Sequence, residues 1–226
     1  MGIGEDRAFI ISLRDTLQSE YPFSNEMQYT AMASYFAFWN ITDVLLLSGM
    51  DIAPDELSKQ LSTVQDISGI GNRLFCARNA VEVMFELGLD SKWDSSKIAR
   101  MRGELNHYGG YKESTLDKEL GSLLSISSGG FPLRIASDCF LSSWVSSSNP
   151  DRQKEIAYLS ANAYLLQSGF VPVIIGKDKL DSLYSSISSF ELSGDPSSFR
   201  EFFYHQEFIA IYNYLAYRMK NNGLPK

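Results

Sequence analysis

The residues with the clearest chemical potential lie in a polar segment between two apolar stretches. Residues 146–155 read SSSNPDRQKE, and apolar residues recur at helical spacing on both sides of them. Arg152 and Lys154 stand at the start of the second expected helix, where positive side chains and free backbone N–H groups attract anions. Asp151 has two interpretations, as the N-cap of that helix or as a metal ligand.

Histidine is scarce, which limits acid–base and metal chemistry. The chain has two histidines, His107 and His205, which lie far apart and have no cysteine or histidine neighbours. Metal sites gather several ligands, so a structural or exposed role fits each histidine better. His107 adjoins a glycine-rich segment and is the better candidate to face a pocket. The phosphate-loop, dinucleotide-binding and G-x-S-x-G motifs are absent, so the sequence predicts neither a metal site nor a bound cofactor.

Composition narrows the classes of partner. The formal net charge of -7 argues against a nucleic-acid-binding surface, which needs clustered Lys and Arg. No leader pattern and no run of about 18 apolar residues is present, so we expect neither a signal peptide nor a membrane contact. Cys76 and Cys139 lie in apolar helical patterns, which indicates buried free thiols and a cytoplasmic protein.

The elements that must position the polar segment are mostly helices. Apolar side chains recur at helical spacing along most of the chain, which predicts a mainly α-helical protein. Pro54 suits a first helical turn, while Gly49, Gly88 and Gly169 suit left-handed positions at helix ends. The expected helices are residues 4–20, 26–47, 54–62, 70–88, 95–106, 132–147, 152–167, 177–190 and 197–221.

Two segments lack this helical period. Residues 107–130 begin and end with glycine pairs, which favours a small β-hairpin or an irregular flap. Residues 170–175, FVPVII, carry strand-like side chains, but Pro172 confines them to a sheet edge or a short extended connection.

Residues 132–175 resemble the core of the Fic/Doc family, whose members transfer a nucleotide monophosphate or a related phospho-group to a protein hydroxyl. In that family a helix beginning with proline leads to the loop H-P-F-x-[DE]-G-N-G-R-x-x-R, and the next helix leads to x-x-G-[YF]-x-P. The positions that match both ends of this pattern in one gapless register are Pro132, Ala136, Asn162, Gly169, Phe170 and Pro172.

The flanking segments agree with this register. Residues 94–114 resemble the family's helix and G-G-[YF]-R turn before a flap that holds the target segment, which places Tyr111 and Lys112 in the flap. Residues 178–203 resemble its two closing helices. The resemblance implies a Fic-like helical bundle with a small β-hairpin flap over residues 51–226, preceded by an N-terminal helical extension over residues 1–50.

The loop itself departs from the family pattern. Ser147 stands at the position of the catalytic histidine, and Asp151 stands at the acid that binds the metal ion. The residues that replace G-N-G-R and the final arginine are Arg152, Gln153, Lys154, Glu155 and Tyr158.

These replacements change the chemistry that the resemblance implies. A serine hydroxyl cannot take a proton as histidine does without a base of its own. Long side chains at 152 and 154 crowd the backbone nest that glycines leave open for phosphate oxygens. We therefore expect standard adenylyl transfer to be lost and nucleotide binding to be doubtful, with Arg152, Lys154 and His107 as cleft candidates.

Three functions remain open on the sequence. The leading interpretation is a Fic-fold protein that binds a protein partner through the old cleft and flap. The alternative is a protein-modifying transferase that uses a nucleotide or nucleotide-sugar, with His107, Asp151, Arg152 and Lys154 in a non-standard site. The third is a helical scaffold whose resemblance to the family is accidental.

Overall fold

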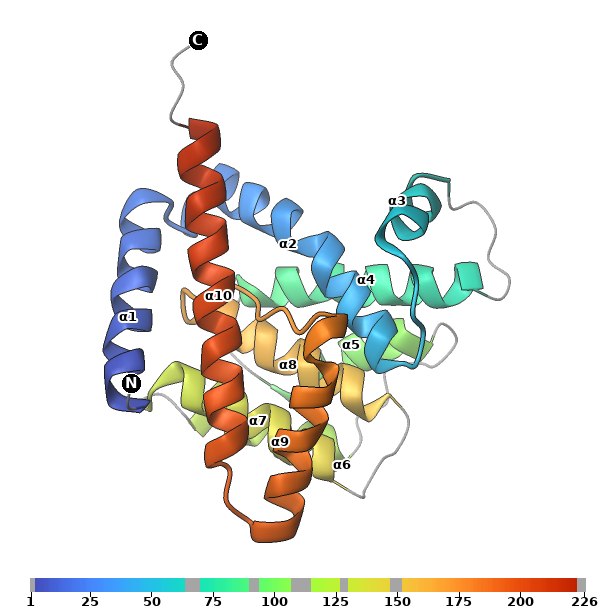
Figure 1. The fold of residues 1–226 in the computed structure, drawn as a ribbon. Coiled ribbons are helices and arrows are strands. Elements are labelled where there is room, and N and C mark those ends of the chain that lie inside the picture. The colour runs from blue at the N-terminus through green and yellow to red at the C-terminus, as the bar shows by residue number, and fades with distance from the viewer. Residues whose placement is uncertain are drawn as a thin grey trace.

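The helices of the chain pack around one central helix (Figure 1). The computed structural model describes residues 3–63, 70–89, 94–106, 115–126, 130–146 and 152–222. Within these ranges the helices are α1 (Ile3–Glu20), α2 (Glu26–Leu47), α3 (Pro54–Thr63), α4 (Ile70–Gly88), α5 (Ser95–Asn106), α6 (Thr115–Ile126), α7 (Pro132–Val145), α8 (Gln153–Gln167), the 3-10 turn η1 (Lys177–Lys179), α9 (Leu180–Ser193) and α10 (Ser197–Asn222).

Helix α8 is the centre of the fold. Every side chain from Glu155 to Leu166 is buried, and the helix packs against α7, α4, α2 and α5. Helix α10 runs across the front of the molecule and packs against α1, α7 and α9 (Figure 1). One hydrophobic core includes side chains from α1 through α10, such as Ile10, Leu45, Leu159 and Ile211. The start of α8 is therefore held by most of the protein.

Glycine ends two of these helices as the sequence predicts. Gly49 follows α2 and Gly169 follows α8 with φ of +81° and +80°, a left-handed conformation that glycine adopts without a Cβ clash. Gly88 is different, because it is not among the positive-φ glycines. A Cβ at Gly88 would lie 2.6 Å from Leu166 Cβ and 2.8 Å from the Tyr29 hydroxyl. Gly88 is thus required by the close approach of α4 to α8.

The expected β-hairpin flap is wrong for residues 115–126, which form helix α6. Leu116, Leu120 and Leu124 recur at a spacing of four, which suits one face of a helix. Asp117 is fully buried and pairs with Arg102 of α5, whose Nη1 lies 2.8 Å from Asp117 Oδ2. None of the described residues forms a strand. Tyr111 and Lys112, assigned to the flap, lie outside the described residues.

Two further expectations can be compared with the structure. Cys76 and Cys139 are free and buried, as predicted. Helix α2 is the one helix in the described ranges whose length and composition would suit a membrane span. Half of its most apolar window is buried inside the protein, and it carries Asn40 and Asp43 into the core. These features are typical of a core helix.

Candidate functional site

The candidate site is the turn that joins α7 to α8. Helix α7 begins at Pro132 and ends at Val145, and Ser146 then takes an extended conformation. The chain enters α8 through Arg152, whose φ of 59° makes it the one non-glycine residue with positive φ in the described chain. Such a conformation is costly for a residue with a Cβ, so surrounding contacts must fix it.

Gln153 links the two helices. Its side-chain Nε2 lies 2.6 Å from the carbonyl oxygen of Ser143 and 2.9 Å from that of Trp144, and it also contacts the carbonyl of Ser146. The last carbonyls of a helix have no partner within the helix, so this amide satisfies the C-terminus of α7. The side chain of Gln153 therefore points back toward α7 and is unavailable to a ligand at the start of α8.

The positive charge of Arg152 is neutralised by Glu155, which lies in the same turn. Its Nη1 lies 3.1 Å from Oε1 of Glu155, whose side chain is 5% exposed. Glu155 also occupies the first turn of α8, where the helix dipole favours a negative charge. An internal carboxylate thus stands beside the position that would attract an anion.

Lys154 is held by aromatic rings. Its Nζ lies 5.1 Å from the ring centroid of Trp144 and 5.1 Å from that of Tyr184. Trp144 in turn stacks on Phe140, with centroids 5.5 Å apart. Cation–π contacts of this kind contribute about 0.5–2 kcal/mol. No carboxylate among the described residues pairs with Lys154, so its charge is not neutralised by an ion pair.

The described side chains of this turn are engaged by contacts within the protein. Gln153 caps α7, Arg152 pairs with Glu155, and Lys154 is packed between rings from α7 and α9. In the register predicted from the sequence, Glu155 stands where the family loop carries an arginine.

The structure brings Arg152 and Lys154 to one turn but leaves other candidates undescribed. Ser147, Asp151 and His107 lie outside the described residues. The described residues contain no group of three or more His, Cys, Asp or Glu side chains placed to bind a metal ion. His205 is exposed on α10 and stacks against Phe208 at 6.4 Å.

Tyr158 anchors a buried polar network behind the site. Its hydroxyl oxygen lies 2.9 Å from Asn40 Oδ1, from Asp43 Oδ2 and from the carbonyl oxygen of Val173. Asn162 accepts a hydrogen bond from the Val173 N–H at 2.9 Å and donates to Asn40 Oδ1 at 3.1 Å. The network ties α2 and α8 to the segment that follows α8.

Asp43 completes the network by binding backbone groups. Its carboxyl oxygens accept hydrogen bonds from the N–H groups of Ile175 at 2.7 Å and Gly176 at 2.9 Å. Burial raises the pKa of Asp43 to about 6, an effect opposed in part by these two N–H groups and by Tyr158. Residues 170–175 thus form a connection that is neither helix nor strand, and side chains accept hydrogen bonds from its backbone N–H groups.

The sequence reasoning missed Asn40 and Asp43. The available signal was a pair of polar residues at a spacing of three within an otherwise apolar helix. Buried polar groups are nearly always hydrogen-bonded, so such a pair predicts a network, but it does not reveal partners more than a hundred residues away.

Comparisons with known proteins support the arrangement of the helices. A scan against protein-family models gives no match, and a search of curated proteins also gives none. Two solved structures of Fic-1 from C. elegans superimpose on this chain with TM-scores of 0.77 and 0.76, both at 15% sequence identity. The matches cover 96% and 94% of this chain and 73% and 71% of the respective Fic-1 chains. The protein therefore has the Fic fold.

Proposed function

We propose that this protein is a Fic-fold protein that has lost adenylyl transfer and acts by binding a protein partner. We place the contact at the turn between α7 and α8. The proposed function includes a cytoplasmic location, a protein partner, and no nucleic acid or membrane among its partners.

The observation that carries the proposal is the internal pairing of the turn. Arg152 has Glu155 as its partner at 3.1 Å, and Gln153 is bonded to the carbonyls of α7. A phosphate at Arg152 would have to displace these contacts and overcome the charge of Glu155. Substitution of the family histidine by Ser147 also removes the general base from the predicted register.

Calorimetry with ATP and with GTP, each with Mg²⁺, tests the loss of nucleotide binding. We expect no binding heat into the millimolar range, and an active Fic protein serves as the positive control. The matched variant restores the family loop with Ser147→His, Arg152→Gly, Gln153→Asn, Lys154→Gly and Glu155→Arg. Micromolar nucleotide affinity of the unaltered protein would overturn the proposal.

The alternative function, a protein-modifying transferase, is supported by the charge of Lys154. Its charge lies among aromatic rings without a carboxylate partner in the described chain, so it could take a phosphate of an unusual donor. Mass spectrometry of a cell lysate incubated with the protein and a panel of nucleotides and nucleotide-sugars distinguishes the transferase from the binding protein. A new mass adduct that disappears in Lys154→Ala supports the transferase, and its absence supports the binding protein.

A further inference from the structure

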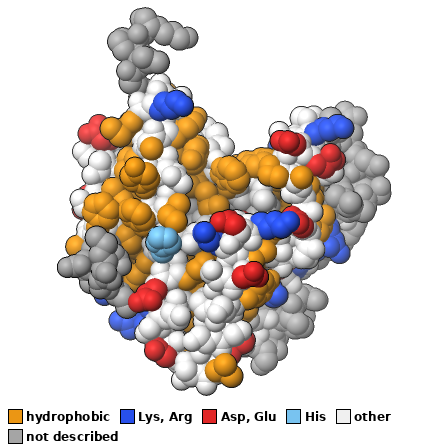
Figure 2. Space-filling model, viewed as in Figure 1, with side chains coloured by type: hydrophobic (Ala, Val, Ile, Leu, Met, Phe, Trp, Pro, Cys, Tyr) orange, Lys and Arg blue, Asp and Glu red, His pale blue; other side chains and the backbone are white. Residues whose placement is uncertain are grey.

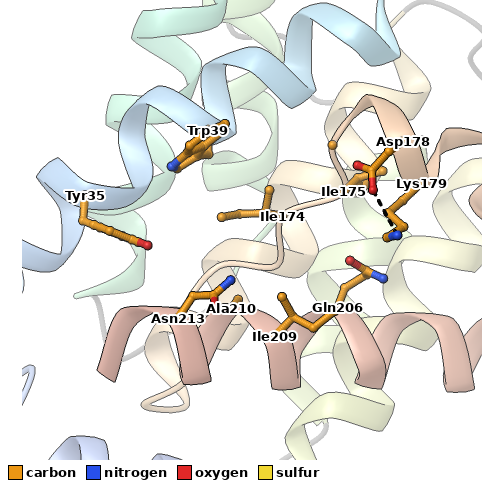
Figure 3. A pocket seen from close by; sticks show the side chains of 11 residues that line it. Tyr35, Trp39, Ile174, Ile175, Asp178, Lys179, Gln206, Ile209, Ala210 and Asn213 are labelled. Carbon is orange, nitrogen blue, oxygen red and sulfur yellow. Dashed lines mark ion pairs between the residues drawn. The ribbon is translucent and has the colours of Figure 1, made fainter. Parts of the chain in front are cut away.

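A cavity lies between α2, the segment after α8, and α10 (Figure 3). Its volume is about 270 Å³. Figure 3 shows Trp39 and Tyr35 on the α2 side, Ile174 in the middle, and side chains of α10 opposite. The residues that carry the argument below are Tyr35, Trp39, Ile174, Gln206, Ile209 and Asn213. None of them belongs to the turn between α7 and α8.

Gln206 is the most informative residue of this cavity. Its side chain is 4% exposed and lines the cavity from α10. Its amide has no hydrogen-bonding partner among the described residues. Neither polar atom of this amide is among the fully buried atoms that lack a partner, so the amide reaches solvent through the cavity and can bond to a ligand there. The amide offers both a donor and an acceptor to such a ligand.

The cavity carries no net charge. Asp178 and Lys179 lie on its rim and pair with each other, with Lys179 Nζ 3.0 Å from Asp178 Oδ2. The other lining side chains are neutral. The two charged lining residues already neutralise each other, so the cavity favours an uncharged group. The rings of Trp39 and Tyr35 favour a flat aromatic one.

On its α2 and α10 sides, the surface around the cavity is also uncharged. Residues 27–42 on α2 and residues 208–217 on α10 contain no Asp, Glu, Lys or Arg, although these make up 21% of the chain. Trp39, Tyr212 and Tyr217 are large exposed hydrophobic residues on these two helices. Figure 2 shows hydrophobic side chains gathered along the upper part of α10 and across to α2. Enrichment in aromatic residues with depletion of charge is typical of the core of a protein interface.

We propose that this cavity receives one uncharged aromatic side chain of a partner protein, whose adjacent backbone amide bonds to Gln206. The cavity is smaller than the roughly 300–1,000 Å³ usual for small-molecule sites, which suits a single inserted side chain. Aromatic anchors in a central pocket supply much of the affinity of many interfaces. This site goes beyond the function proposed above, because its residues lie apart in the sequence from the turn between α7 and α8.

The probe is N-acetyl-L-tryptophanamide, which joins one neutral aromatic ring to two amide groups. We expect saturable changes in the ¹H–¹⁵N NMR signals of the Gln206 side-chain amide and the Trp39 indole N–H, with millimolar affinity. Asn213→Arg places a charge at an exposed lining position and should weaken binding at least tenfold. Gln206→Ala should weaken it to a similar extent. Leu192→Arg, at a residue that is 91% exposed on α9, is the matched control and should leave binding unchanged.

Three results would overturn the inference. The first is the absence of saturable shifts at Gln206 and Trp39 in the folded protein. The second is equal binding of the charged probe N-acetyl-L-lysinamide, which would contradict selection for an uncharged aromatic group. The third is unchanged binding in Asn213→Arg, a substitution at an exposed residue that leaves the core intact. None of these results depends on nucleotide binding, so this test and the calorimetric test can fail separately.

Discussion

The hydroxyl of Tyr158 has one proton, yet three oxygens lie 2.9 Å from it. A phenol can donate one hydrogen bond and must accept any others. Asp43 is the only one of the three neighbours that can carry a proton of its own, and burial raises its pKa to about 6. Because this pKa lies near 6, the network changes its charge in mild acid.

Glu207 on α10 is a second buried carboxyl group whose pKa is raised. It is fully buried, and neither carboxyl oxygen has a hydrogen-bonding partner of good geometry among the described residues. Burial raises the pKa of Glu207 well above its usual value, and the nearby Val171 N–H opposes this only in part. The folded state therefore holds a proton on Glu207 that the unfolded chain releases.

This difference predicts how Glu207→Gln responds to pH. A raised pKa stabilises the folded state fully below the usual value of 4.5, and that contribution is lost as the pH rises toward the folded pKa. Glutamine has no proton to lose, so the variant should gain about 1–3 kcal/mol in unfolding free energy relative to the unaltered protein between pH 5 and pH 8.

Urea denaturation of both proteins at the two pH values measures that gain. Glu201→Gln is the control, because Glu201 lies exposed on the same helix and should show no such trend. A constant stability difference between the unaltered protein and Glu207→Gln across this range would show that Glu207 is ionised in the folded state.

At the scale of elements, Gly88 fixes how closely α4 can pack on α8. Helix propensity alone predicts that Gly88→Ala stabilises a helix by up to about 1 kcal/mol. The added Cβ would lie 2.6 Å from Leu166 Cβ and 2.8 Å from the Tyr29 hydroxyl. We therefore expect the opposite sign, a loss of about 1–3 kcal/mol, because overpacking forces the helices apart.

The melting temperature of Gly88→Ala decides between these two effects. A lower melting temperature supports the packing constraint. A higher one would mean that α4 and α8 separate without cost and that propensity dominates. Ser142→Ala, at an exposed site on α7, is the control for a small propensity gain without a clash.

Helical spacing of apolar side chains predicted the bounds of most helices. The match is close for α2 and α5, where the expected residues 26–47 and 95–106 are the observed ones. The sequence did not predict helix α6, because the glycine pairs on either side of it favour turns and because its helical pattern of leucines spans few residues. The buried pair of Arg102 and Asp117, which fixes α6 on α5, depends on contacts that no local pattern encodes.

The candidate site was predictable in place but not in detail. The sequence predicted a polar segment between two helices, and α7 and α8 lie on either side of it. The capping of α7 by Gln153 and the ring contacts of Lys154 could not be predicted, because they depend on how α7, α8 and α9 meet in space.

At the scale of the whole molecule, α2 is bonded to α8 through Asn40 and to the segment after α8 through Asp43. The hydrophobic core also runs without a break from α1 to α10. The division of the chain near residue 50 into an extension and a Fic-like domain stays a prediction. If the two parts are separate domains, they unfold separately; if they are one, they unfold together.

Two tryptophans report on these parts separately. Trp39 lies on α2 and Trp144 on α7. The double variant Trp93→Phe with Trp144→Phe keeps only Trp39, and Trp93→Phe with Trp39→Phe keeps only Trp144. We expect the two fluorescence transitions in urea to have the same midpoint, because shared buried contacts make unfolding cooperative. Separate midpoints would show that residues 1–50 unfold as an independent unit.

The extended segment after α8 also restricts the manner in which a partner can bind. The N–H groups of Val173, Ile175 and Gly176 already bond to side chains, and Pro172 has no N–H to donate. A partner strand that extended this segment by β-augmentation would find few unbonded donors along it. Partners that contact residues 172–176 must therefore recognise side chains such as Ile174, and specificity rests on the shape of an inserted residue.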